Sequence, residues 1–270
     1  MPTTHSADGT PIAYEGTGSG PALILVDGAM CYRASNGQRP LADKLADRFT
    51  VYVYDRRGRG ESGDTDPYAP QREVEDIAAL IEVAGGSASL AGVSSGAVLV
   101  LLAAAAGLPI ERIAVYEPPF AIDETLLARQ KTALVAMEAA LAAGRRSGAV
   151  QTFMRLVGVP AVGRHMMRLF PMYRQMTGIA HTLPYDLAII GTTGPAPMLA
   201  GRPFAAITTP TLVMAGGLSP EATLVAPGRG AAEQIPGARF EILPGQTHRV
   251  SPDALAPALA GFLAPAGVRD

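Results

Sequence analysis

The residues Gly92-Val93-Ser94-Ser95-Gly96 have the composition and spacing of a turn that presents a catalytic serine. They follow an apolar run at residues 87–93 and precede a helix-like run at 95–107. In this setting a G-x-S-x-G sequence predicts a nucleophile elbow, whose small residues let strand and helix pass close together. Ser94 would stand at the helix N-terminus, where free N–H groups favour a developing negative charge. The pentapeptide alone also fits an ordinary turn, so the prediction depends on the strand–turn–helix setting.

A serine nucleophile needs a base, and four histidines are available. His5 lies in the N-terminal tail, and His165 and His181 lie in a helix-rich middle section. His248 follows the last predicted strand, in a loop at the strand's carboxyl end. In a parallel sheet that loop faces the same edge as the elbow. Chain order therefore predicts His248 as the base for Ser94; the competing interpretation is a histidine of a surface loop.

The elements that must position these residues alternate between strands and helices. A hairpin turn at Gly9-Thr10 leads into a strand. Strands are predicted at 11–15, 22–26, 50–54, 87–93, 112–116, 210–215 and 238–243. Helices are predicted at 41–48, 72–84, 95–107, 231–235 and 253–263. Such alternation predicts an α/β protein with a mainly parallel sheet covered on both faces.

Composition limits the classes of partner. The 270 residues are 48% hydrophobic and 17% charged, with a formal net charge of −2 and no basic block. This pattern excludes nucleic acid and a polybasic membrane anchor as expected partners. No apolar run reaches the length of a membrane span, and the polar N-terminus lacks the core of a signal peptide. The single cysteine, Cys31, excludes an intrachain disulfide. We expect a soluble, cytoplasmic protein.

Residues 120–204 interrupt the alternation. Helices are predicted at 124–143 and 149–156, and no strand is. Seven of the ten methionines fall in this segment, among them Met154, Met166 and Met172. Methionine adapts to irregular apolar shapes, so one interpretation is a cap whose methionines line an apolar pocket. The other is that these methionines fill the core of the segment itself.

Four segments together resemble the α/β-hydrolase fold family over residues 12–262. They are Val26-Asp27-Gly28-Ala29, Asp55-Arg56-Arg57-Gly58-Arg59-Gly60-Glu61-Ser62, the elbow, and Gly245-Gln246-Thr247-His248. The resemblance implies a mostly parallel eight-stranded sheet with helices on both faces. It also implies a core domain at 1–119 and 205–270 and an inserted helical cap at 120–204.

The same resemblance implies an oxyanion hole of two backbone N–H groups, those of Ser95 and Ala29, with Met30 as a neighbour that contacts substrate. Asp27 stands where the family usually has histidine. We expect it to brace the loop; the alternative is that its carboxylate, if ionised, disfavours anionic substrates. Asp55 is expected to bond backbone groups of its own turn. Its three neighbouring arginines are expected to form structural pairs or to face solvent.

The third member of the triad departs from the family pattern. The usual acid follows the seventh strand, where this chain has Ser219. Some family members take the acid from the end of the sixth strand, and Glu117 stands there, followed by two prolines. We therefore predict a triad of Ser94, His248 and Glu117. Glu221 and Asp253 remain alternative acids, and Ser219 could instead orient His248 through its hydroxyl.

The predicted function is hydrolysis of an apolar small-molecule ester, thioester or lactone through an acyl-enzyme, with neither metal nor organic cofactor. Predicted substrate contacts are Met30, Met154, Met166 and Met172. Because one fold supports several chemistries, carbon–carbon cleavage or cyclisation in natural-product metabolism is an alternative. A ligand-binding module with a degraded triad is another.

Overall fold

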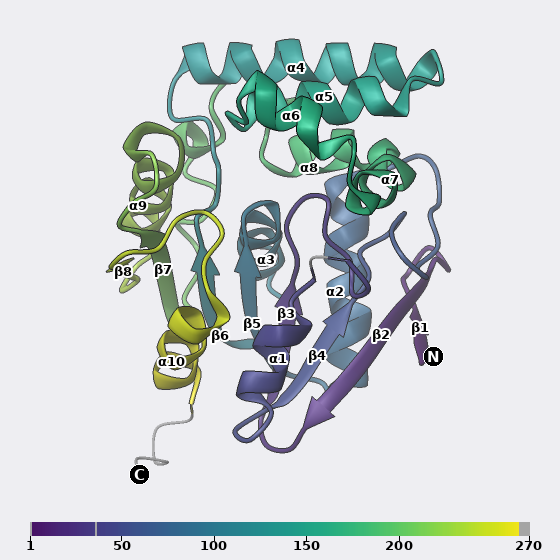
Figure 1. Ribbon diagram of the computed structural model, residues 1–270. Helices are drawn as coiled ribbons and strands as arrows, with labels where there is room; N and C mark the ends of the chain where they lie inside the picture. The colour runs from purple at the N-terminus through teal and green to yellow at the C-terminus, as the bar shows by residue number, and fades with distance from the viewer. Residues whose placement is uncertain (1, 36, 265–270) are drawn as a thin grey trace.

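The computed structural model describes residues 2–35 and 37–264. Its sheet has eight strands in the order β1-β2-β4-β3-β5-β6-β7-β8 (Figure 1). β2 pairs antiparallel with β1 and β4, and all other neighbours are parallel. The strands are β1 Thr3–His5, β2 Pro11–Gly18, β3 Ala22–Val26, β4 Thr50–Tyr54, β5 Ala88–Val93, β6 Ile110–Tyr116, β7 Thr211–Gly216 and β8 Arg239–Leu243. The predicted fold class is confirmed.

Two hydrophobic clusters lie on opposite faces of the sheet, because successive side chains of a strand point to opposite sides. In β3, Leu23 and Leu25 join one cluster, and Ile24 and Val26 join the other. Helices α1 (Arg39–Leu45) and α10 (Pro252–Leu263) cover the first face. Helices α2 (Pro70–Val83), α3 (Ser95–Ala105) and α9 (Ala226–Gln234) cover the second. Burial on both faces explains why the central strands are continuous apolar runs.

The predicted elements exist, and their ends differ by a few residues. The helix predicted at 41–48 is α1, which begins earlier because Pro40 suits a first helical turn. The helix predicted at 231–235 is the longer α9, which follows a π-helical turn at Glu221–Val225. Its Pro227 stands in the first turn, where proline is tolerated. Proline and glycine have low helix propensity, so the start of this helix was not predicted from the sequence.

Between β6 and β7 the chain forms helices that lie over the carboxyl ends of the parallel strands, at the top of Figure 1. They are α4 Glu124–Ala142, α5 Arg146–Leu156, α6 Ala161–Met167, α7 Pro171–Gly178 and α8 Leu183–Ile189, with 3-10 turns at Ala180–Thr182 and Met198–Gly201. We call residues 120–204 the cap region; its division from the core at these boundaries stays a prediction. Within the ranges that the structure describes, none of the helices is long and apolar enough to cross a membrane.

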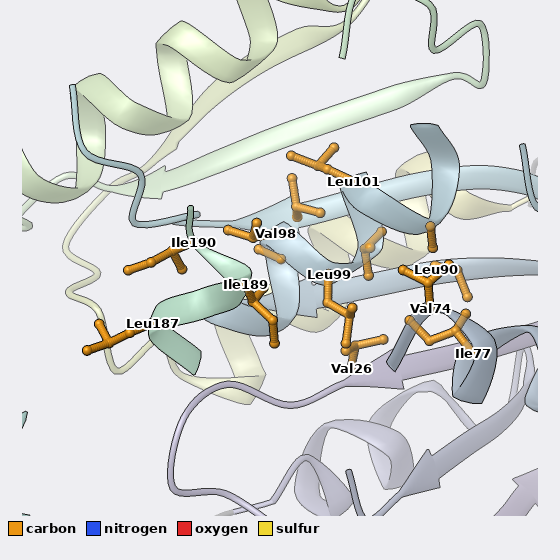
Figure 2. Close-up of a cluster of buried hydrophobic side chains, with 14 of the residues drawn as sticks. Val26, Val74, Ile77, Leu90, Val98, Leu99, Leu101, Leu187, Ile189 and Ile190 are labelled. Atoms are coloured by element: carbon orange, nitrogen blue, oxygen red, sulfur yellow. The ribbon is translucent and has the colours of Figure 1, made fainter. Parts of the chain in front are cut away.

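The cap region and the core share one hydrophobic cluster. Leu187, Ile189 and Ile190 belong to the same cluster as Val98 and Leu99. Figure 2 shows these side chains of α8 and the residue after it gathered beside those of α3. The helix that follows Ser94 therefore packs on one side against the sheet and on another against the cap region.

Candidate active site

The elbow is held in a backbone conformation that is rare for serine. Ser94 has φ 57° and ψ −128°, between the end of β5 and the start of α3. Its N–H donates to the carbonyl of Tyr116 at 2.9 Å, which ties the turn to the end of β6. A Cβ on Gly92 would lie 2.5 Å from the Gly96 carbonyl oxygen, and one on Gly96 would lie 2.5 Å from that of Asp27. Only glycine permits these approaches, so the spacing of the pentapeptide follows from packing.

His248 reaches Ser94 from the loop after β8. Its Nε2 lies 3.2 Å from Ser94 Oγ, and its Nδ1 lies 2.6 Å from Glu117 Oε2. The Tyr116 hydroxyl, at the end of β6, holds this loop by donating to the Thr247 carbonyl at 2.7 Å. With the proton on Nδ1, His248 donates to Glu117 and its Nε2 accepts from the Ser94 hydroxyl. This is the tautomer that a general base requires.

Glu117 is fully buried at the end of β6, with φ 50°. Its Oε1 accepts from the Gly216 N–H at 2.7 Å, so both carboxylate oxygens have partners. Burial acts to raise the pKa of Glu117, but hydrogen bonds at the carboxylate, first of all from His248, outweigh it and hold the pKa below its usual value. A charged carboxylate is thus available to orient the imidazole.

The other acids considered from the sequence lie elsewhere. Glu221 faces Arg229 at 3.6 Å on the surface, and Asp253 pairs with Lys44 at 2.5 Å. The Ser219 hydroxyl lies beside Glu117 and acts to lower its pKa. Of the four candidates, Glu117 is the one that contacts His248.

The loop after β3, residues 27–31, lies directly against the serine. A Cβ on Gly28 would be 3.0 Å from Ser94 Cβ and 3.7 Å from Ser94 Oγ. Met30 in this loop has φ 62°, and with Ser94 and Glu117 it accounts for three of the four non-glycine residues of positive φ in the described ranges. Strained backbone of this kind gathers at functional sites. The N–H groups of Ala29 and Ser95 both belong to segments beside Ser94, as the predicted oxyanion hole requires.

The methionines predicted to contact substrate fall into two groups. Met30 and Met154 are buried in the hydrophobic cluster that the core and cap region share. Met166 and Met172 lie on α6 and α7 with 54% and 36% of their surface exposed. For Met154 the burial agrees with a core role as well as with a pocket wall. Contact of all four with substrate stays a prediction.

The motif after β4 is buried, not solvated. Asp55 accepts from the N–H groups of Arg33 and Glu61 at 2.7 and 2.9 Å, as expected of a residue that braces its turn. Arg56, Arg57 and Arg59 are at most 1% exposed. Arg57 pairs with Asp76 and Asp8 at 2.7 and 2.9 Å. The expectation of structural pairs is therefore met.

Asp186 of the cap region lies beside the elbow, and the sequence did not predict it there. Its Oδ1 accepts from Arg56 Nη1 at 2.8 Å and from Ser95 Oγ at 2.7 Å, and its Oδ2 accepts from Arg59 Nη2 at 2.7 Å. Burial acts to raise the pKa of Asp186, but the charges of Arg59 and Arg56 outweigh it and lower that pKa. The available signal was a single carboxylate inside the apolar run 183–190. Buried carboxylates need such partners.

The pKa of Asp27 is raised, in contrast to the lowered pKa of Asp186. Asp27 is 5% exposed, and burial raises its pKa to about 7 although the charge of Arg59, hydrogen bonds from Gln38 and the charge of Arg56 act to lower it. Those two arginines already face the carboxylates of Glu73 and Asp186. A third carboxylate in this group therefore lacks a cation of its own, which favours its neutral form.

The shift of Asp27 predicts a pH-dependent stability. An unfolded aspartate has a pKa of about 3.9, so between about pH 4 and pH 7 the folded protein holds a proton that unfolding releases. The contribution of protonated Asp27 to the free energy of unfolding is complete below the unfolded pKa and is lost as pH rises through the folded pKa. Urea unfolding should show Asp27→Asn gaining about 3 kcal/mol relative to the wild type between pH 5 and pH 8. A difference independent of pH would contradict this.

Comparisons with known proteins agree with this architecture. A model of the Alpha/beta hydrolase family matches residues 17–258. The crystal structure of an alpha/beta hydrolase from Sphaerobacter thermophilus DSM 20745 is 51% identical, with a TM-score of 0.85 over 97% of this chain and 99% of that one. A thermophilic esterase from Thermogutta terrifontis is 21% identical, with a TM-score of 0.73 over 97% of each chain. An enol-lactonase from Burkholderia xenovorans LB400 is 24% identical, with a TM-score of 0.67 over 97% of this chain and 99% of that one. The last two show likeness of fold alone, whereas the family model and the first structure show that the chain belongs to the α/β-hydrolase family.

Proposed function

We propose that this protein is a serine hydrolase that cleaves an ester, thioester or lactone bond of an apolar small molecule. The observation that carries the proposal is the hydrogen-bonded line from Glu117 through His248 to Ser94, with distances of 2.6 and 3.2 Å. Base and orienting acid come from the ends of two strands and meet beside the elbow. This is the arrangement that activates a serine hydroxyl.

In the proposed reaction, His248 Nε2 takes the hydroxyl proton as Ser94 Oγ attacks the carbonyl carbon. The N–H groups of Ser95 and Ala29 hold the oxyanion that forms, each contributing about 3 kcal/mol. His248 then returns the proton to the departing oxygen or sulfur, and the acyl group stays on Ser94. Water, deprotonated by His248, attacks the acyl-enzyme and releases the carboxylic acid and the free serine.

The substrate class rests on the family and on the cap region. Among the solved structures of the same fold are an esterase and an enol-lactonase, both of which act on ester-type bonds. The cap region supplies apolar side chains, and we propose Met30, Met154, Met166 and Met172 as contacts to an apolar acyl or leaving group. Methionine suits such contacts because its side chain adapts to different shapes.

A fluorophosphonate probe tests this function without knowledge of the natural substrate. We expect covalent labelling of the folded protein and, after proteolysis, a mass shift on the peptide that contains Ser94. A series of nitrophenyl esters of increasing chain length then reports the size of the acyl site. A folded protein that takes no label would refute the activated serine and favour a ligand-binding module.

A further inference from the structure

Two buried arginines hold the 27–31 loop by its carbonyl groups. Arg59 Nη1 donates to the Gly28 carbonyl at 2.7 Å and to that of Cys31 at 3.4 Å. Arg56 Nη1 donates to the Asp27 carbonyl at 3.2 Å. Bonds from a charged donor are about twice as strong as neutral ones, so these contacts fix the loop firmly.

The bond to Gly28 also determines the direction of an N–H group. The carbonyl of Gly28 and the N–H of Ala29 belong to one planar trans peptide unit and point in opposite directions. Arg59 holds the carbonyl, so the Ala29 N–H must point away from the guanidinium. Since Gly28 lies against Ser94, the orientation of this single peptide unit decides whether Ala29 can donate to an oxyanion formed on Ser94.

The second donor is connected to the same arginines through the cap region. The carbonyl of Ser94 accepts from the Ala97 N–H at 2.9 Å. The Ser95 N–H belongs to the same peptide unit and therefore points the opposite way, out of the N-terminal end of α3. The Ser95 hydroxyl donates to Asp186, and Asp186 also accepts from Arg56 and Arg59. Asp186 stands on α8, whose apolar residues pack beside α3 (Figure 2). One carboxylate of the cap region thus joins both segments that carry the oxyanion donors.

We propose that Arg59 and Asp186 are positioning residues for the oxyanion hole, Arg59 by holding the Gly28–Ala29 peptide and Asp186 by holding Arg59 and Ser95. This inference rests on the proposed function, because it needs an oxyanion at Ser94. Under this proposal the packing of the cap region on the core matters for catalysis. Loss of Asp186 loosens both N–H donors, those of Ser95 and Ala29, without removing a substrate contact.

Arg57 provides a matched control. It is buried to the same degree as Arg59, comes from the same motif and pairs with two carboxylates, Asp76 and Asp8. Its other bonds go to the Arg72 carbonyl and the Ser6 hydroxyl, away from the 27–31 loop. Arg57→Lys and Arg59→Lys each keep the charge and lose the planar fork of donors. Only Arg59→Lys is expected to disturb the Gly28–Ala29 peptide.

The test is the rate of labelling by a fluorophosphonate, whose transition state places a negative oxygen in the hole. For Arg59→Lys we expect the inactivation rate constant to fall about tenfold or more, since loss of one donor costs about 10²- to 10³-fold. The concentration of probe at half-saturation should stay within about twofold, because the hole acts on the transition state. Arg57→Lys should label at nearly the wild-type rate. Equal rates for the two variants would overturn the inference.

A second pair decides the matter if Arg59→Lys does not fold, as judged by circular dichroism. Asp186→Asn and Asp76→Asn each remove one carboxylate charge that pairs with buried arginine, Arg56 and Arg59 in the first case and Arg57 in the second. We expect Asp186→Asn to slow labelling at least threefold relative to Asp76→Asn, and no difference would overturn the inference. Folded wild-type protein that takes no label would overturn the proposed function and this inference together. Labelled wild type with equal variant rates overturns the inference alone.

Discussion

Glu117→Gln is expected to lower kcat/KM by about 10³- to 10⁴-fold while leaving the fold intact. The Gly216 N–H donates to Oε1, so the amide oxygen of glutamine must take that side. The amide NH₂ then faces His248 Nδ1, which can only accept from it. This moves the imidazole proton to Nε2, the tautomer that cannot accept the proton of Ser94. The measurement is ester hydrolysis at saturating and limiting substrate, with thermal unfolding as the check on the fold.

Two further variants separate a catalytic role of Glu117 from a structural one. Glu221→Gln changes the exposed acid that the sequence left as an alternative, and its activity should stay within about twofold of the wild type. In a Glu117→Ala background, Ser219→Asp supplies a carboxylate at the family's usual position, beside the place of the lost one. We expect it to restore activity at least tenfold. Full activity of Glu117→Gln would show that Glu117 only fills its buried site.

Asp186→Ala is expected to lower the free energy of unfolding by about 3–5 kcal/mol. Arg56 would keep its ion pair with Glu73, but Arg59 would lose its ion pair with Asp186, and the Ser95 hydroxyl would lose its acceptor. The cost arises because a charge left unpaired away from water is far more expensive than the original pair was favourable. Urea unfolding measures it directly.

The control for this prediction is an exposed ion pair. Glu241→Ala breaks the pair with Arg239, whose side chains are 44% and 59% exposed. Its cost should be below about 1 kcal/mol, because water screens such pairs. A loss of similar size in both variants would mean that Asp186 contributes no more than a surface carboxylate.

The strands and long helices could be predicted because each carries its own signal. Continuous apolar runs identify β3 to β7, and helical spacing identifies α2. The cap region was predicted only in part. Helices α6, α7 and α8 have eight residues or fewer, so each offers barely two turns of periodicity, and prolines and glycines between them conceal their ends. Each of them packs against α5, and α8 also packs against α3 of the core.

The sequence by itself indicated the family and predicted the elbow at Ser94 and His248 as its base, because these follow from local spacing and from the order of strands along the chain. It limited the partner of His248 to three acids, Glu117, Glu221 and Asp253, or the hydroxyl of Ser219. Only the tertiary structure decided that Glu117 lies against His248, since that contact joins residues 131 apart and depends on how the end of β6 turns. The structure alone also brought Asp186 to Arg56, Arg59 and Ser95. Such contacts depend on how far a side chain reaches and on what is buried around it in the folded protein. No local pattern in the sequence predicts them.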